Sequence, residues 1–225
     1  MKIGIIAAMR KELDLLLPLL QDCNERHDGG MEFHCGTVGN HEVIAMQCGI
    51  GKVNAAMGAL SLINAFSPDY VINSGVAGGA DLGIHVMDVV AGARVAYHDV
   101  WCGPESEIGR VQGLPLYFDG AQRLLDLLPQ RDDLHKGLIC SGDQFIDEMA
   151  GVQRIKGNFP EALAVDMESG AIAQVCHLRQ VPFLALRVIS DSPGASHDNT
   201  RQYLDFWTDA PRETFNMVKD IINQL

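Results

Sequence analysis

The chain has 225 residues, 47% of them hydrophobic and 20% charged, which is enough apolar material for one large buried core. The formal net charge of −12 argues against nucleic acid or an anionic membrane as a partner, because both attract basic surfaces. No apolar run is long enough to span a bilayer, and the short run near the start favours a buried strand over a signal peptide. We therefore expect a single cytoplasmic domain over residues 1–225, with free thiols and no metal site.

Apolar periodicity and glycine-rich turns predict strands that alternate with helices. In chain order we expect strand 2–8, helix 9–20, strands 32–38 and 42–48, helix 55–66, strands 69–73 and 86–97, a loop at 101–115, helix 120–128, strand 136–140, helix 148–155, strand 163–165, a helix around 171–176, strand 181–189 and helix 201–225. Pro18 leaves the end of the first helix open, and Pro211 favours a break in the last. This order predicts an α/β fold, a three-layer α/β/α sandwich around a mixed, mostly parallel sheet.

The stretch 163–194 organises the expected site. It reads strand, helix, strand, and carboxylates follow both strands, at Glu168 and Asp191. Ligands of open α/β sheets bind outside the carboxyl ends of the strands, so we expect Glu168, Arg187 and Asp191 to converge on one pocket. Structural explanations also exist: Glu168 fits a helix-start acid, Asp191 fits an N-cap, and Arg187 fits a buried ion pair for which Glu12 is a candidate partner.

Glycine-rich segments follow two other strands. Residues 49–54 (GIGKVN) join a strand to a helix, where backbone N–H groups can meet a ligand, although a tight turn explains the segment equally well. Residues 74–79 contain three glycines in five residues, so the backbone there approaches another group closely or turns sharply. Glu12, just past the first strand, fits an ordinary helix-start acid when taken alone.

Taken together, these segments resemble one family. GIIAAMRKEL, CGIGKVNAA, NSGVAGG, ARVAYHD, SGDQFI, AVDMES and RVISD resemble, in this order, the 5'-methylthioadenosine/S-adenosylhomocysteine nucleosidases of the nucleoside phosphorylase superfamily. The resemblance runs from Met1 to about Asp191. It implies a nucleoside phosphorylase-like fold, hydrolysis of the N-glycosidic bond of an adenine nucleoside with a 5'-thioether, and no cofactor.

The resemblance assigns the two catalytic roles to carboxylates. Asp191 matches the general acid that protonates purine N7, and Ser190 is placed to orient it. A carboxyl group can be this acid at neutral pH only if burial or a negative neighbour raises its pKa. Glu12 matches the general base that activates the attacking water. Here the resemblance reverses the interpretation of Glu12 as a helix-start acid.

The same resemblance implies a ribose subsite. Glu168 matches the residue that accepts the two ribose hydroxyls, since a carboxylate has two acceptor oxygens for a vicinal diol. Met167 is expected to pack on the sugar, and Arg187 to lie near the ribose and the water. We expect the neighbouring Asp166 to be solvated.

Base and thioether subsites are implied as well. Phe145 matches the aromatic ring that stacks on adenine, and the backbone of Ile146 matches the groups that read the base edge. Met9, Ile50 and the loop around Trp101 are expected to line the apolar 5' subsite. Plain core packing is a stronger explanation for Met9 and Ile50 than for Trp101, a large aromatic residue in a Gly/Pro-rich loop. The family's last helix supplies an aromatic lid, for which Tyr203, Phe206 and Trp207 are candidates.

Two features bear on the nucleophile. Asn73 stands where a phosphorylase has an arginine, which favours water over phosphate. Val76, which with Gly78 belongs to the expected substrate-binding set, stands where the nucleosidases commonly have a water-holding serine. The alternatives are a futalosine or aminofutalosine hydrolase, a purine nucleoside phosphorylase, or an inactive nucleoside binder. The family also implies a homodimer, with the loop near Trp101 close to the partner's site.

Overall fold

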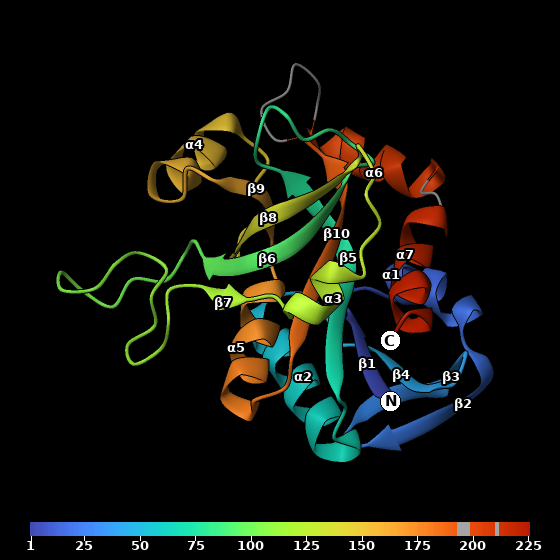
Figure 1. Ribbon diagram of the computed structural model, residues 1–225. Helices are drawn as coiled ribbons and strands as arrows, with labels where there is room; N and C mark the ends of the chain where they lie inside the picture. Colours follow the sequence, from blue (N-terminus) through green and yellow to red (C-terminus); the bar gives the residue numbers. More distant parts are fainter. Residues whose placement is uncertain (193–198, 210–211) are drawn as a thin grey trace.

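The computed structural model describes residues 1–192, 199–209 and 212–225 (Figure 1). Its elements are β1 (Lys2–Ala7), α1 (Arg10–Leu16), the 3₁₀ helix η1 (Leu17–Leu19), β2 (Gln21–Asp28), β3 (Met31–Val38), β4 (His41–Gln47), α2 (Lys52–Phe66), β5 (Tyr70–Gly79), β6 (Val89–Tyr97), β7 (Phe118–Asp119), α3 (Gln122–Asp126), β8 (Leu134–Ser141), α4 (Met149–Asn158), β9 (Ala162–Asp166), α5 (Ser169–Arg179), β10 (Phe183–Asp191), α6 (Asn199–Asp209) and α7 (Arg212–Asn223).

One ten-stranded mixed sheet carries the fold, in the order β10-β6-β8-β9-β5-β1-β4-β3-β2, with β7 attached to β6. An additional pairing of β10 with β5 closes β5, β10, β6, β8 and β9 into a ring. Among the described residues the sheet is mixed, as expected, with five parallel and five antiparallel strand pairings, and the parallel ones include the long β1–β4, β10–β5 and β6–β8 ladders. The antiparallel pairings are those of the β2–β3–β4 meander, of β7 with β6, and of β10–β6 and β5–β9 within the ring.

Helices cover both faces of this sheet (Figure 1). The alternation of side chains along β1 shows why: Ile3 and Ile5 pack with Leu13 and Leu16 of α1, whereas Ile6 points to the opposite core. That opposite core contains residues of α2 and α5, and the first core also contains residues of α3 and α7. Among the described residues, no helix is both long enough and apolar enough to cross a membrane.

Several boundaries differ from the sequence predictions. All eight residues of β2 are exposed and lack an apolar alternation, so nothing local marked them as a strand; the pairing with β3 makes them one. The first helix ends at Leu16, before Pro18, and β5 and β10 continue to Gly79 and Asp191. Pro211, where we expected a break, and the turn at Pro193 and Gly194 lie outside the described residues.

Candidate active site

A cavity of about 350 Å³ opens at the carboxyl ends of β1, β5, β9 and β10. The residues that line it extend in the chain from Ala8 to Leu204, and the ring of strands brings their segments together. Twelve of the expected site residues line it: Met9, Glu12, Ile50, Val76, Gly78, Phe145, Ile146, Met167, Glu168, Ser190, Asp191 and Tyr203. Six lining residues were not expected there: Ala8, Ala77, Gln144, Val165, Asp166 and Leu204.

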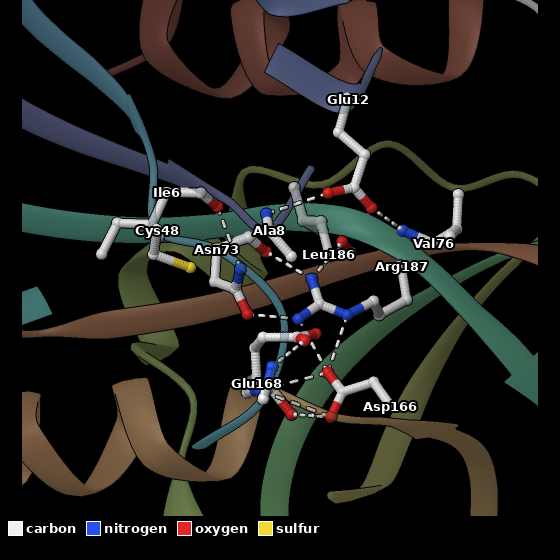
Figure 2. Close-up of polar contacts among 12 residues, drawn as sticks. Ile6, Ala8, Glu12, Cys48, Asn73, Val76, Asp166, Glu168, Leu186 and Arg187 are labelled. Atoms are coloured by element: carbon white, nitrogen blue, oxygen red, sulfur yellow. Dashed lines mark hydrogen bonds and ion pairs between the residues drawn. The ribbon is translucent and has the colours of Figure 1, made fainter. Parts of the chain in front are cut away.

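Glu12 is 2% exposed, although it lies in the first turn of α1. Its Oε2 accepts hydrogen bonds from the backbone N–H groups of Ala8 (2.9 Å) and Met9 (2.8 Å), and its Oε1 accepts one from Val76 (3.0 Å). Burial raises the pKa of Glu12, and these backbone donors and the charge of Arg187 oppose the shift. The carboxylate therefore both caps the helix and faces the cavity, fixed by three donors (Figure 2).

Space for this carboxylate depends on Gly75. A Cβ atom built on Gly75 would lie 2.7 Å from Oε1 of Glu12, closer than real Cβ contacts allow. The glycine-rich segment after Asn73 thus serves a close approach of side chain to backbone, one of the two explanations its composition allowed.

Arg187 forms a buried network below the cavity floor, with its side chain 1% exposed (Figure 2). Its Nε donates to Oδ2 of Asp166 at 2.8 Å, Nη1 donates to the carbonyl oxygen of Asn73 at 3.0 Å, and Nη2 also donates to the Asn73 side chain. Asp166, which we expected to be solvated, is buried and is the ion-pair partner; Glu12 is not. Both carboxylates are buried, so their placement decides: the Glu12 oxygens are held by three backbone N–H groups, whereas Oδ2 of Asp166 lies 2.7 Å from Nη2 of Arg187.

Glu168 follows β9 by two residues, is the N-cap of α5 and is 7% exposed. Its Oε1 accepts a hydrogen bond from the backbone N–H of Gly51 at 2.8 Å. Burial, reinforced by the negative charge of Asp166, raises the pKa of Glu168 to about 7. The glycine-rich segment 49–54 therefore donates a backbone hydrogen bond to Glu168, which in turn lines the cavity.

Asp191 is 1% exposed at the end of β10. The Oγ atom of Ser190 lies 2.5 Å from Oδ1 of Asp191 and 3.3 Å from the carbonyl oxygen of Ala77. A hydroxyl donor at 2.5 Å fixes the orientation of the carboxyl group. The three carboxyl groups of Glu12, Glu168 and Asp191 thus line the same cavity, each buried and each held by a donor.

The outer wall of the cavity consists of larger and more exposed side chains. Phe145 is 50% exposed, and its ring makes an edge contact with Tyr203 at 5.8 Å between centroids. The Tyr203 hydroxyl lies 3.3 Å from the sulfur of Met9. Of the three aromatic candidates in the last helices, Tyr203 is the one that lines the cavity, beside Leu204.

A cycle of three hydrogen bonds joins the loops at Asp99 and Asp143 to the start of α2. The backbone N–H of Lys52 donates to Asp143 at 2.7 Å, the backbone N–H of Asp143 donates to Asp99 at 2.8 Å, and the Lys52 ammonium donates to Asp99 at 2.7 Å. Asp143 precedes Phe145 by two residues, so the cycle ties the base-side loop to the start of α2. No local pattern marks it, because Asp99 and Asp143 lie in two separate loops and Lys52 begins α2.

Two expected residues lie elsewhere. Arg187 lies beneath the cavity rather than on its surface, and Trp101 is 64% exposed and does not line the cavity of its own chain. Among the described residues, one cluster could hold a metal ion: Glu25, Glu32 and His34. It lies on β2 and β3, outside the cavity, and no metal-binding cluster coincides with the three carboxylates within those residues.

Comparison with known proteins identifies the family. The phosphorylase superfamily model matches residues 2–223. A 5'-methylthioadenosine/S-adenosylhomocysteine nucleosidase of Halalkalibacterium halodurans is 39% identical over 234 residues, covering 100% of this chain and 99% of that protein. The chain belongs to this nucleosidase family. The family membership expected from the sequence motifs is confirmed.

Solved structures agree with this assignment. The S. pneumoniae 5'-methylthioadenosine/S-adenosylhomocysteine nucleosidase, bound to the transition-state inhibitor MT-ImmA, is similar with a TM-score of 0.92 and 37% identity over 99% of this chain and 98% of that one. A futalosine hydrolase mutant of Helicobacter pylori is also similar, with a TM-score of 0.92 but 28% identity, over 100% of this chain and 99% of that one. The nucleoside phosphorylase-like α/β fold is therefore shared by both activities, and sequence identity favours the nucleosidase.

Proposed function

We propose that this chain hydrolyses the N-glycosidic bond of 5'-methylthioadenosine and S-adenosylhomocysteine, releasing adenine and the 5-thioribose product. The observation that carries this proposal is the convergence of Glu12, Glu168 and Asp191, all buried, on one cavity lined by apolar and aromatic groups. Family membership at 39% identity supports it. The roles of the individual residues follow from what each group can do.

Asp191 is the proposed general acid. Departure of a purine anion is costly, and a proton on N7 makes the base a neutral leaving group. Asp191 lines the cavity with Phe145 and Ile146, the groups proposed to stack on and read the base. Ser190, 2.5 Å from Oδ1, holds the carboxyl group toward the base. Positioned acids of this kind typically contribute about 10²- to 10⁴-fold in rate.

Glu12 is the proposed general base for water. Its raised pKa makes it a better proton acceptor near neutrality than an exposed glutamate. Val76 donates its backbone N–H to Glu12, a contact that does not depend on the side chain at position 76. We infer that valine in place of serine is tolerated because the backbone there, with Gly75, still positions the base.

Glu168 is the proposed ribose ligand. The Gly51 N–H occupies one of its oxygens, and the remaining acceptor positions can bind the vicinal hydroxyls. Met167 lines the cavity beside it, as a packing surface for the sugar. Arg187 does not touch the cavity, so its proposed contribution is to hold Asp166 and Asn73 under this floor.

Water rather than phosphate is the proposed nucleophile. Among the described residues that line the cavity, none is arginine or lysine. Asn73, at the position of a phosphorylase arginine, is committed to Arg187 and to the carbonyl oxygen of Ile6, 2.9 Å from its Nδ2. A dianionic phosphate would therefore meet carboxylates without a compensating cation.

A homodimer is part of this proposal. Exposed apolar side chains run along one side of α2, at Val53 (71% exposed), Met57 (53%) and Leu60 (41%), one helical turn apart. They continue from Ile50 at the cavity mouth, and the exposed Trp101 is available to a partner's cavity. Burial of this stripe between copies would bring the Trp101 loop to the second site.

We also propose an α/β/α layering of the fold, which the helices packed on both faces of the sheet support.

The test is adenine release from methylthioadenosine, adenosylhomocysteine and aminofutalosine, each with and without phosphate. We expect phosphate-independent release from the two thioethers. Release from aminofutalosine alone would make the chain a futalosine-type hydrolase, and release only with phosphate would make it a phosphorylase. Asp191→Asn should lower the rate by about 10³-fold or more while the protein stays folded. The exposed Asp220→Asn is the matched control, and wild-type turnover by Asp191→Asn would remove Asp191 from the mechanism.

A further inference from the structure

A second, open groove of about 640 Å³ adjoins the cavity. Three residues, Ala8, Met9 and Ile50, line both, so the groove begins at the wall that the cavity assigns to the 5' substituent. Beyond them it runs over the first turn of α1 and the start of α2. There the lining changes from apolar to polar and charged side chains, at Arg10, Lys11, Asp14, Gln47 and Asn54.

Of the two cations that line the groove, Lys11 is the one without a carboxylate partner among the described residues. Its ammonium lies 3.9 Å from the ring centroid of Trp207 and 4.9 Å from that of Tyr203. Within residues 1–192, 199–209 and 212–225 it makes no ion pair, and partial burial lowers its pKa, with Glu12 opposing that shift. Arg10, by contrast, donates from Nε to Asp14 at 2.7 Å and lies 3.7 Å from Glu32. A bound carboxylate would therefore find its counter-ion in Lys11.

Acceptors lie on the other part of the groove. Asp14 has two carboxylate oxygens, one of which bonds Arg10. Asn54 donates its amide nitrogen to the carbonyl oxygen of Ile50 at 2.7 Å, which turns its oxygen to a different side. The groove thus offers a cation and separate oxygen acceptors, the complement of a group that carries both a carboxylate and an ammonium.

We propose that this groove binds the zwitterionic amino-acid end of a homocysteine substituent, with Lys11 taking the carboxylate and Asp14 with Asn54 the ammonium group. The inference rests on the proposed function and adds a specificity-determining site to it. A methylthio substituent ends among Met9, Ile50 and Tyr203 and has no atoms to place in the groove. The zwitterionic end has no net charge, so its recognition depends on a cation and oxygen acceptors placed locally rather than on the net charge of −12 of the chain.

The test compares kcat/KM for adenosylhomocysteine with kcat/KM for methylthioadenosine in the full chain. Lys11→Met should lower this ratio about tenfold, mainly through KM for adenosylhomocysteine, and Lys11→Arg should keep most of it. Lys219→Met, on the exposed side of α7, is the control and should leave the ratio unchanged. For the wild type, rising salt should lower the ratio, because the contact is partly exposed.

A third nucleoside separates charge recognition from displacement of Tyr203. The 5'-(3-aminopropylthio) analogue lacks the carboxylate, so Lys11→Met should not lower its turnover relative to methylthioadenosine. A ratio within about twofold of wild type in Lys11→Met, or an equal loss for this analogue, would overturn the inference. In either case the proposed hydrolysis stands. Absence of adenine release from every thioether by the wild type would instead remove the proposed function itself.

Discussion

The inner and outer walls of the cavity are built in different ways. On the inner wall, Glu12 and Asp191 are held on strand ends and a helix start by hydrogen bonds of 2.5 to 3.0 Å, at 1–2% exposure. On the outer wall, Phe145 and Tyr203 meet through ring edges, and Phe145 is half exposed. The groups proposed to move protons are thus fixed by directional bonds, whereas the groups proposed to recognise the substrate's apolar parts rest on contacts that tolerate adjustment.

This contrast predicts that removal of a buried ionic partner from the inner side of the cavity disturbs folding as well as chemistry, while outer-wall changes alter binding alone. The reason is the local dielectric. A buried charge that loses its partner keeps its full desolvation penalty. When an exposed ring is removed, water fills its place and no charge is left uncompensated. Four substitutions test the contrast, in decreasing order of expected effect.

Arg187→Met tests the buried network beneath the inner wall. Removing one partner of a buried ion pair leaves Asp166 uncompensated, and we expect a loss of about 3–5 kcal/mol in the free energy of unfolding, measured in urea. Arg110→Met, which breaks an exposed pair with Glu107, should cost below about 1 kcal/mol. Replacing Asp166 by leucine in the same chain should recover part of the loss; a loss no larger than the control's would contradict the network.

Glu168→Gln tests the protonation of the inner wall. The pKa of about 7 in the folded state exceeds the usual 4.5, so the folded protein binds more protons than the unfolded chain in this interval. Stability of the wild type should therefore fall as pH rises from about 4.5 to about 7, by an amount on the order of 3 kcal/mol from this group. Glu168→Gln should remove that part of the fall.

The measurement is the free energy of unfolding at about pH 5 and about pH 8 in both proteins. Glu161→Gln, at an exposed glutamate paired with Arg94, provides the control. If the wild type and Glu168→Gln lose the same stability between these two pH values, the pKa of Glu168 is not raised by burial in the folded protein.

Gly75→Ala tests how tightly Glu12 is seated. The new methyl group would lie 2.7 Å from Oε1, so the carboxylate or the strand must move. We expect a loss of about 1–3 kcal/mol in stability from overpacking, and a fall of about 10²-fold in kcat/KM from displacement of the base. Gly157→Ala in α4, where no atom lies within 4 Å, is the control. Full activity in Gly75→Ala would show that Glu12 is not held as tightly as its contacts indicate.

Tyr203→Leu tests the outer wall and should have the smallest effect. Loss of the ring contact with Phe145 should raise KM by about 2- to 10-fold, because such pairs contribute about 0.5–1.5 kcal/mol. Thermal stability should change little, and Tyr203→Phe, which keeps the ring, should stay close to wild type. A collapse of stability in Tyr203→Leu would erase the distinction between the two walls.

Local patterns carried much of the prediction. Apolar runs located β1, β4, β8 and most of β10, and polar residues at strand ends located Glu168 and Asp191, because strand ends share one edge of a sheet. Glu12 needed the family resemblance, since a helix-start acid has the same local sequence. Where the pattern was weak, as in the polar β2, the pairing with β3 decided the structure.

The sequence by itself therefore determined the fold class, the family and the carboxylates at the strand ends, because these depend on short-range periodicity and on motifs. Tertiary structure decided the rest. Asp166 and not Glu12 pairs with Arg187, and β10 pairs with both β5 and β6, because closure of the strand ring sets which residues meet. The placement of Lys11 beside Tyr203 and Trp207 also depends on how α6 packs against α1. Contacts of this kind join residues far apart in the chain, so no local pattern encodes them.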